Sequence, residues 1–485
     1  MLILFFHIPF PSSRIPPLEK KKIMQKRKLF LAIALLIVLM LALQACGGSK
    51  ATEAPAPTKA PAATEAPAAT EAPAATEAPA AKEEECDLTG KLTFWGHENH
   101  PLDKIREAFL KEHPCVELDW QHMQDYDSKF KTAMAAGTGA PDLYWAEETE
   151  VKRYASQDAL IETTDMINTI KDDLVPAKLK EAWVESKQGY YGMPGDISAS
   201  GIYYRPDLLA EIGVEIKDDM TYDEFLEILK KIAASGKNAV LFPTGGQFVA
   251  TAYWSWFDAQ YGGVGPTSCD NQTALFNSPE SVQAVELLKA IYDTGSTLET
   301  DFWTPEYWNA INSDQLVLDL APAWARGFWE ANLNEDQMGK WRLAPLPRAV
   351  PGGPQSGIWG GATLVSPVTT ENPELAMEFM KFAFGSMEGA AAAADWGIVP
   401  PYVPYLEGPY QQERTELFGE QNSNAMILQL AKSLNPNFCR TAAYSAAVDE
   451  LLTPAIEEMV VSGADIKETL DQLNDDLTDL LPDYQ

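Results

Sequence analysis

The sequence predicts an α/β fold of more than one domain, and three observations support this prediction. Strand-like and helix-like segments alternate from about residue 90 onward, as in a mostly parallel sheet with helices on its faces. The chain has 485 residues, which is too long for one simple core, so we expect two or three domains. Hydrophobic residues make up 46% of the chain and charged residues 22%, a composition typical of globular proteins.

The chain opens with the pattern of an export signal. A basic cluster at 26–28 precedes an almost wholly apolar run at 29–43, and the motif L-Q-A-C then ends at Cys46. Because Cys46 directly follows a small residue, we interpret 1–46 as a lipoprotein signal, with a lipid on Cys46 after cleavage. An uncleaved membrane anchor is the alternative.

Two further N-terminal segments are expected to lie outside the fold. Residues 1–23 look like an upstream extension, and Met24 is a more natural start. Residues 47–86 are rich in Ala, Thr, Glu and Pro, and the hexad A-T-E-A-P-A recurs in them. This segment has no apolar face to bury, so we predict a disordered linker that could extend to roughly 100 Å.

Acidic residues dominate the rest of the chain. The net charge is −33, and the residues after Cys46 hold 30 basic and 69 acidic side chains, a balance of −39. This charge argues against nucleic acid and anionic membrane surfaces as partners, and it disfavours anionic ligands. Solubility of a secreted protein is an equally simple reason for the charge.

The first half of the folded part reads as a βαβαβ unit. Apolar residues at Leu102, Ile105 and Phe109 recur with helical spacing, and the neighbouring segments have strand composition. The expected elements are a strand at 91–95, a helix at 102–113, a strand at 116–121, a helix at 128–136 and a strand at 142–145.

The second half continues the alternation. Thr221 is a helix N-cap signal followed by acidic residues in the first turn. The expected elements are helices at 150–157, 221–232, 278–292, 373–384 and 388–396, strands at 240–242 and 315–320, extended segments at 341–345 and 357–366, and a mostly helical C-terminus at 442–480.

Four cysteines remain after the signal, and an even number in an exported chain indicates disulfides. They allow three pairings. Cys86 and Cys115 each precede a strand-like segment, so they would lie at the same sheet end if those strands are neighbours. We therefore expect Cys86–Cys115 and, by elimination, Cys269–Cys439. No C-x-x-C or close His pairing indicates zinc, and no metal or cofactor is expected.

The segment 135–148 points to a ligand. Gly and Pro between 137 and 141 turn the chain into a buried strand that ends in Trp145, Glu147 and Glu148. Ligands of open α/β sheets bind at the carboxyl ends of strands. A large ring and carboxylates at that place suit a polyhydroxylated molecule, because rings stack on C–H faces and carboxylates accept hydroxyl hydrogen bonds.

An ordered set of motifs covers the chain from Asp87 to its end. They are K-L-T-F-W, K-T-A-M-A-A-G-T-G-A-P-D-L-Y-W-A, Y-G-M-P, G-I-Y-Y-R-P-D-L-L, T-Y-D-E-F-L-E-I-L-K-K, A-P-A-W-A-R-G, W-R-L-A-P-L-P, G-G-A-T-L-V-S-P and N-P-E-L-A-M-E-F-M-K-F. In this order they resemble the extracellular solute-binding proteins of ABC importers, in particular the sugar-binding family that includes the maltose/maltodextrin-binding protein.

The resemblance implies a two-lobe periplasmic-binding-protein fold of type II, with mixed sheets, flanking helices and a hinge that the chain crosses about three times. The crossings would fall near 196–201, near 358–362 and after Pro401. Lobe one would comprise 87–197 plus 360–405, and lobe two 198–359 plus 406–485.

The same resemblance implies ligand-binding residues on both lobes and at the hinge. A core position is the alternative for Trp145, an ion pair for Arg326, and a core ring for one of Trp254 and Trp256. His97 departs from the maltodextrin-binding pattern, so that sugar is not assigned. The expected ligand-binding residues are Trp95, His97, Asn99, Trp145, Glu148, Asp196, Ser198, Trp254, Trp324, Arg326, Trp359 and Tyr444.

We therefore expect a monomeric binding protein, lipid-anchored to the outer face of the cell membrane, that captures a neutral oligosaccharide and delivers it to the permease subunits of an ABC importer. The sequence has no G-x-S-x-G, H-E-x-x-H or P-loop motif, so no catalytic residues are expected. One alternative is a polyamine or other cationic ligand, which would need several acids in the cleft. A surface polysaccharide hydrolase is the other.

Overall fold

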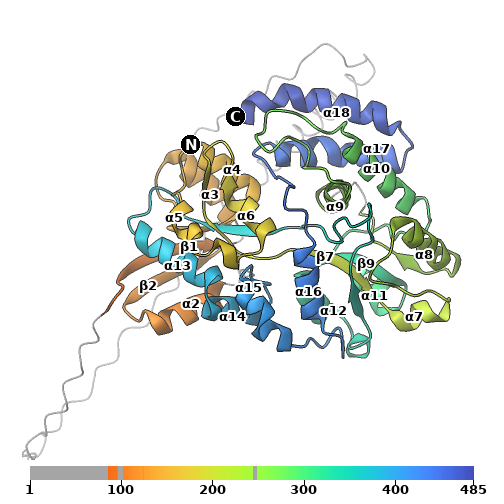
Figure 1. Ribbon diagram of the computed structural model, residues 1–485, viewed down its shortest axis with the longest axis horizontal. Helices are drawn as coiled ribbons and strands as arrows, with labels where there is room; N and C mark the ends of the chain where they lie inside the picture. Colours follow the sequence, from red (N-terminus) through yellow and green to blue (C-terminus); the bar gives the residue numbers. More distant parts are fainter. Residues whose placement is uncertain (1–85, 97–101, 124, 244–247, 485) are drawn as a thin grey trace, which may run out of the picture. The chain divides into compact units, whose positions relative to one another are not determined.

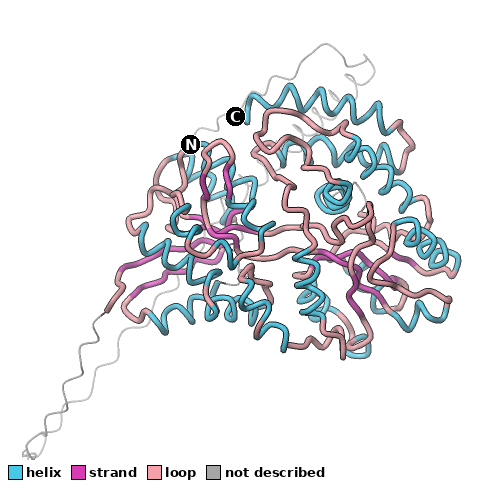
Figure 2. Tube along the Cα trace, in the orientation of Figure 1, coloured by secondary structure: helices cyan, strands magenta, loops and turns pink. Residues whose placement is uncertain are grey.

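Two β-sheets organise the chain in the computed structural model, which describes residues 86–96, 102–123, 125–243 and 248–484. All of these residues belong to one compact unit, 83–485. The first sheet has the strand order β2-β1-β3-β11-β6 and the second the order β10-β7-β9-β8. Figure 2 shows helices around both groups of strands. The expected mixed sheets with flanking helices are therefore confirmed.

The first sheet contains the predicted βαβαβ unit. Strand β1 alternates buried Leu92 and Phe94 with more exposed neighbours, which is the period of a strand with one face in the core. Asp142 accepts hydrogen bonds from the Thr93 backbone N–H (2.7 Å) and hydroxyl (2.8 Å), which aligns β3 beside β1. The strands are β1 (Gly90–Gly96), β2 (Val116–His122), β3 (Leu143–Glu147), β6 (Met193–Pro194) and β11 (Ala362–Val365).

Strands β2, β1 and β3 are parallel, whereas β11 is antiparallel to both β3 and β6. Helices α2, α13 and α14 pack together beside β1 and β2 (Figure 1). The helices of this part are α2 (Leu102–Glu112), α3 (Tyr126–Ala136), α4 (Glu148–Ser156), α5 (Thr164–Asn168), α6 (Pro176–Ala182), α13 (Pro373–Gly385), α14 (Met387–Trp396) and α15 (Val403–Glu407), with a small hairpin of β4 (Trp183–Val184) and β5 (Gly189–Tyr190).

The second sheet is built around β9, all seven residues of which are buried. Strand β7 is antiparallel to β9 and β10, and β8 is parallel to β9. The expected strand at 240–242 is displaced to Asn238–Ala239, because Val240 adopts a left-handed backbone conformation (φ 62°) that ends the ladder. The strands are β7 (Ser200–Tyr204), β8 (Asn238–Ala239), β9 (Leu316–Pro322) and β10 (Arg342–Ala344).

Helices around the second sheet begin at the signals that the sequence contains. Thr221 and Glu224 form a reciprocal capping box at α8, and Ser278 caps α10 by accepting a hydrogen bond from Ser281 N. A π-helical turn at Val249–Trp254 leads into α9. The helices are α7 (Pro206–Glu211), α8 (Tyr222–Ala234), α9 (Ser255–Tyr261), α10 (Pro279–Tyr292), α11 (Pro305–Asn312), α12 (Ala325–Asn332), α16 (Ser423–Lys432), α17 (Thr453–Val460) and α18 (Ile466–Leu480).

Three segments that pass between the sheets are hydrogen-bonded to one another. The first segment joins β6 to β7, the second joins β10 to β11, and the third follows α14. Ile197 N donates to Val399 O (2.7 Å), Trp359 N donates to Ser198 O (3.1 Å), and Ser200 N donates to Gly357 O (2.9 Å). A hinge crossed three times is thus present, near the predicted positions.

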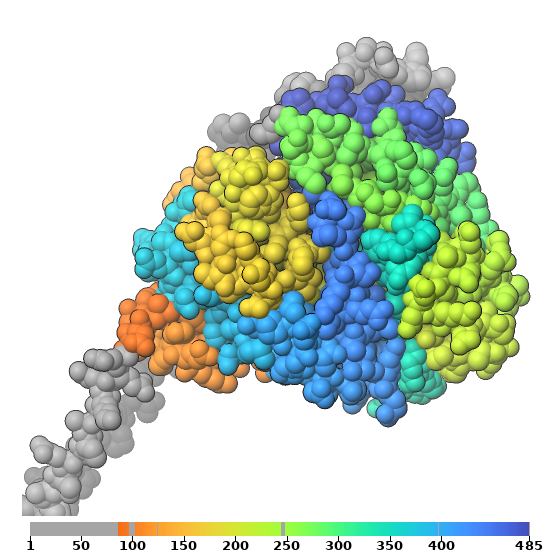
Figure 3. Space-filling model, in the orientation of Figure 1, coloured from red at the N-terminus to blue at the C-terminus, as the bar shows by residue number. Residues whose placement is uncertain are grey.

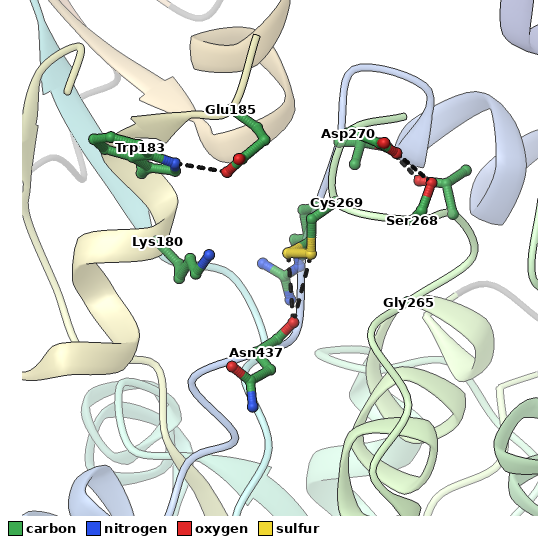
Figure 4. Close-up of a disulfide and its surroundings, with 12 residues drawn as sticks. Lys180, Trp183, Glu185, Gly265, Ser268, Cys269, Asp270 and Asn437 are labelled. Atoms are coloured by element: carbon green, nitrogen blue, oxygen red, sulfur yellow. Dashed lines mark hydrogen bonds between the residues drawn. A yellow bond between two sulfur atoms is a disulfide. The ribbon is translucent and has the colours of Figure 1, made fainter. Parts of the chain in front are cut away.

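Both expected disulfides are present and confirmed. Cys86 is joined to Cys115 because β1 and β2 are parallel neighbours and both cysteines precede them. Cys269 is joined to Cys439 across a sequence separation of 170 residues, as Figure 4 shows. Among the described helices, none has the length and apolar character needed to cross a bilayer.

Candidate functional site

Trp145 lies near the carboxyl end of β3, where the sequence places the ligand. Its indole is half-buried and packs at 5.5 Å from the Phe384 ring. Gly195, in the first hinge segment, lies directly against this indole, and a Cβ at residue 195 would overlap the ring. A glycine is therefore required here for close approach of backbone and ring. The first hinge segment and the Trp145 ring are therefore packed directly against each other.

The two acids at this strand end differ in surroundings. Glu147 is exposed, yet the surrounding protein replaces part of its hydration and raises the pKa of its carboxyl to about 7, with Arg440 opposing the shift. Glu148 is only 5% exposed. Its Oε1 lies 3.7 Å from Lys152 Nζ and accepts a hydrogen bond from Arg440 N (3.4 Å). Sequence reasoning preferred Glu148, and its ligand role stays a prediction.

Asp196 and Ser198 hold the hinge. One Asp196 oxygen accepts from Ala362 N (2.9 Å) and the other from the Ser198 hydroxyl (3.0 Å). Ser198 is fully buried. The contact with Ala362 joins the first hinge segment to the start of β11, and a ligand contact for Asp196 or Ser198 stays a prediction.

Trp324 and Trp359 come together, although 35 residues separate them in the chain. The Trp324 indole N–H donates to the Trp359 carbonyl oxygen (2.8 Å), and the two ring centroids are 5.7 Å apart. Trp324 lies two residues after the end of β9, and Trp359 lies in the second hinge segment. Gly360, at φ 78°, turns the backbone beside the Trp324 ring. The structure thus places both predicted rings at the junction of the second sheet and the hinge.

Three of the remaining predicted residues, Trp254, Tyr444 and Arg326, are held by contacts within the protein. Trp254 is fully buried, and its indole N–H donates to Ser281 Oγ (3.2 Å), as expected for the core alternative. Tyr444 is also buried, and the centroid of its ring lies 5.5 Å from the guanidinium carbon of Arg440. Arg326 donates to Asn424 Oδ1 (3.2 Å).

One more predicted residue lies in β1. Trp95 is half-buried in β1 and pairs in register with Tyr144 of β3. His97 and Asn99 lie outside the described residues. A ligand contact for each of the three stays a prediction.

Arg440 is a central residue of this region that sequence reasoning missed. Its guanidinium donates to Gly360 O (3.1 Å) and Ile358 O (2.8 Å), both in the second hinge segment. Its backbone N–H reaches Glu148 on the first-sheet side, and the neighbouring Cys439 is tied to Cys269. Figure 3 shows the blue C-terminal segment running between the yellow and green parts of the surface. No local motif marks Arg440, because its partners are distant in sequence.

Charged groups of both signs surround the hinge. Lys178 and Glu181 form a buried ion pair against Gly361, and burial raises the pKa of the Glu181 carboxyl while Lys178 opposes the shift. Burial also lowers the pKa of Lys152 beside Glu148. Among the described residues, no group of three or more His, Cys, Asp or Glu is placed to hold a metal ion.

A cavity of about 130 Å³ lies beside the Cys269–Cys439 disulfide. It is lined by the segment from Lys180 to Ser186 on one side and by residues around the disulfide on the other (Figure 4). Glu148 and Arg440 also line it. Its volume is below the roughly 300–1,000 Å³ of ordinary ligand pockets, so it fits water rather than an oligosaccharide.

Comparisons with known proteins agree with this architecture. The family model described as "Bacterial extracellular solute-binding protein" matches residues 104–412. The arabinooligosaccharide-binding protein of Halalkalibacterium halodurans is 26% identical over 382 residues, covering 72% of this chain and 80% of that protein. The protein of the same name from Bacillus subtilis is 26% identical over 318 residues, covering 62% and 70%.

Solved structures show the same fold. The sugar-binding protein MalE from Xanthomonas citri superposes with a TM-score of 0.68 at 19% identity, covering 81% of this chain and 98% of that chain. The expected two-lobe type II fold is therefore confirmed.

Proposed function

Because the chain belongs to the bacterial extracellular solute-binding protein family, we propose that it captures a neutral oligosaccharide between its lobes and delivers it to an ABC permease. One observation supports this above all: indoles from both sheets meet the hinge. Trp145 packs on Gly195 of the first hinge segment, and Trp324 bonds to Trp359 of the second. Gly195 N in turn donates to Ala362 O (2.8 Å). A ligand that stacks on both indoles would favour the closed state.

The charge balance favours a neutral ligand over a polyamine. A cationic ligand would need a large excess of acids around the hinge, but the four acids there lie among three bases that oppose their charge, which leaves a net charge of only −1. The acids are Glu147, Glu148, Glu181 and Asp196, and the bases are Lys152, Lys178 and Arg440. The relatives named above are called arabinooligosaccharide-binding proteins, which also supports an oligosaccharide.

Binding rather than catalysis is the proposed activity. The relatives are binding proteins, and the site provides rings and hydrogen-bond acceptors. We propose stacking roles for Trp145, Trp324 and Trp359, and we add Glu147 to the expected Glu148 as an acceptor of sugar hydroxyls.

Export and anchoring complete the proposal. The family is extracellular. The L-Q-A-C motif supports a signal over 1–46 and a lipid on Cys46, with the linker at 47–86 holding the binding unit away from the outer face of the membrane. We also propose a monomer. The lobe boundaries, 87–197 plus 360–405 and 198–359 plus 406–485, are proposals of the same kind.

Calorimetric titration with arabino-oligosaccharides, malto-oligosaccharides and spermidine tests this function. We expect saturable binding of an oligosaccharide, with an affinity at least about tenfold weaker in Trp324→Ala, equivalent to about 1.4 kcal/mol. Trp120→Ala, which removes another half-buried indole in β2 far from the hinge segments in sequence, should bind normally. Binding of spermidine alone, or turnover of a sugar, would refute the proposal.

A further inference from the structure

The Cys269–Cys439 disulfide joins two irregular segments that are far apart in the chain. The first segment, 262–278, runs from the end of α9 to the start of α10, and the second, 433–443, follows α16. Figure 4 shows the disulfide between them. Because an irregular segment is held by few repeating backbone hydrogen bonds, a covalent link has a large share in fixing where such a segment lies.

Two hydrogen bonds reinforce this link on both sides of Arg440. Cys439 N donates to Val264 O (2.9 Å), and the hydroxyl groups of Thr441 and Thr267, both buried, are hydrogen-bonded at 2.7 Å. Cys439 and Thr441 are the chain neighbours of Arg440. The backbone that carries the Arg440 side chain is therefore tied to the segment 262–278 by the disulfide and by these two bonds.

The Arg440 guanidinium extends this tie to the hinge. Its Nη1 donates to Gly360 O (3.1 Å) and its Nη2 to Ile358 O (2.8 Å), so it holds the carbonyl groups of the two residues that flank Trp359. A planar guanidinium with donors in a fixed arrangement permits only a narrow range of geometries for the two groups that it holds. The contacts thus lead without a break from the disulfide, through Arg440, to the backbone of Trp359.

We propose that the Cys269–Cys439 disulfide positions Arg440, and through it Trp359, so that reduction of this disulfide weakens ligand binding. The inference rests on the proposed function, in which Trp359 stacks on the ligand. After reduction, the bonds of Cys439 N and of the two threonine hydroxyls keep the segments near each other, while the side chain of Arg440 is held less precisely. The result is a weaker site in a folded protein.

Reduction is a two-electron exchange with a dithiol. A thiolate of the reagent attacks one sulfur and the S–S bond breaks, which gives a mixed disulfide and one cysteine thiolate. The second thiol of the reagent then displaces the other cysteine, so that both cysteines end as protonated thiols and the reagent as a disulfide. Cys269 is half-buried and borders the cavity of about 130 Å³ described above, which gives a small dithiol access to the bond.

The other disulfide offers a matched control. Cys86 and Cys115 are both exposed and precede β1 and β2, so they lie at the amino ends of these parallel strands, whereas Trp145 lies near the carboxyl end of β3. Dithiothreitol should reduce this pair as well. The full chain is titrated by calorimetry, oxidised and reduced, with the arabino- or malto-oligosaccharide that the wild type binds, and alkylation followed by mass spectrometry identifies the free thiols.

The affinities should separate the two disulfides. We expect reduction to weaken wild-type binding about fivefold, and Cys269→Ser/Cys439→Ser to show this weaker affinity with or without the reductant. Cys86→Ser/Cys115→Ser should bind like the oxidised wild type and lose about fivefold on reduction. In Arg440→Met the contacts at Ile358 and Gly360 are already absent, so reduction should change the affinity less than about twofold.

Thermal unfolding of each sample sets a titration temperature at which the protein is folded, because opening a disulfide lowers stability whatever its role. Unchanged affinity of the reduced wild type, with Cys269 and Cys439 identified as thiols, would overturn the positioning role while leaving the proposed function intact. A fivefold loss that persists in Arg440→Met would do the same. A wild-type protein that binds no oligosaccharide would overturn both.

Discussion

Replacing Arg440 by methionine tests how the second hinge segment is held in place. The Arg440 side chain is 5% exposed and donates to the carbonyl oxygens of Gly360 and Ile358. Methionine fills a similar space without hydrogen-bond donors or charge. The Ile358 carbonyl would still accept a hydrogen bond from the Trp256 indole N–H (3.0 Å). The substitution therefore mainly leaves the Gly360 carbonyl without this donor and the nearby acids without the positive charge of Arg440.

The expected magnitude follows from these contacts. A hydrogen bond to a charged group contributes about 1.5–3 kcal/mol net, so two such bonds contribute roughly 3–6 kcal/mol. Removing the guanidinium also removes its own desolvation cost, which offsets part of the loss. After the substitution, Glu148 keeps Lys152 and the backbone N–H of residue 440 as partners. We expect the free energy of unfolding to fall by about 3 kcal/mol, near the low end of values for broken buried pairs.

Urea denaturation followed by tryptophan fluorescence measures this difference. Arg414→Met is a matched control, because Arg414 is exposed and its Nη1 likewise donates to two carbonyl oxygens, those of Gln411 (2.9 Å) and Glu413 (2.8 Å). At an exposed position such hydrogen bonds are readily replaced by hydrogen bonds to water, so the free energy of unfolding of Arg414→Met should fall by less than about 0.5 kcal/mol. If the free energy of unfolding falls no more in Arg440→Met than in Arg414→Met, then burial does not make the Arg440 hydrogen bonds stabilising, and the prediction is refuted.

Two other predictions concern pH and the N-terminus. Burial raises the pKa of Asp258 to about 8, so the folded state keeps a proton that the unfolded state releases near pH 4, and wild-type stability falls as pH rises between about 4 and 8. Asp258→Asn has no carboxyl at this position, so its stability should not change with pH for this reason. The difference in urea midpoint between Asp258→Asn and the wild type should therefore favour the variant more at about pH 9 than at about pH 5. The same difference at both pH values would contradict the raised pKa of Asp258. Cys46→Ser should move the expressed protein from the detergent phase to the aqueous phase in detergent partitioning; a variant that stays in the detergent phase would exclude the lipid at Cys46.

The sequence correctly predicted those strands and helices in which apolar residues recur with a regular spacing. Strands β1, β2 and β3 and helix α2 lie within two residues of their expected bounds, because their apolar spacing alone fixes which face is buried. The Cys86–Cys115 pair followed from the same spacing, since two parallel neighbouring strands bring their preceding residues together.

Positions that depend on tertiary contacts were not predictable in this way. Trp254 reads as a site candidate in sequence, but the helical path at 249–261 turns its ring into the core toward Ser281. Val240 ends a strand early because of its backbone conformation, which its side chain disfavours. Arg440 gains its importance from carbonyl groups that are distant in sequence, so no local motif separates it from other arginines.

The end of β3 shows how one residue of register changes the assignment of a site. Side chains alternate along a strand, so Trp145 and Glu147, two residues apart, share a face, and both are more exposed than Tyr144 and Ala146 between them. Glu148 begins α4, and its carboxylate turns toward Lys152 one helical turn later. A ligand that stacks on Trp145, as we propose, would therefore meet Glu147 first, while Glu148 accepts a hydrogen bond from the backbone N–H of Arg440 in the C-terminal segment. Spacing in the sequence placed both acids at the strand end, and the strand-to-helix transition gives them different tasks.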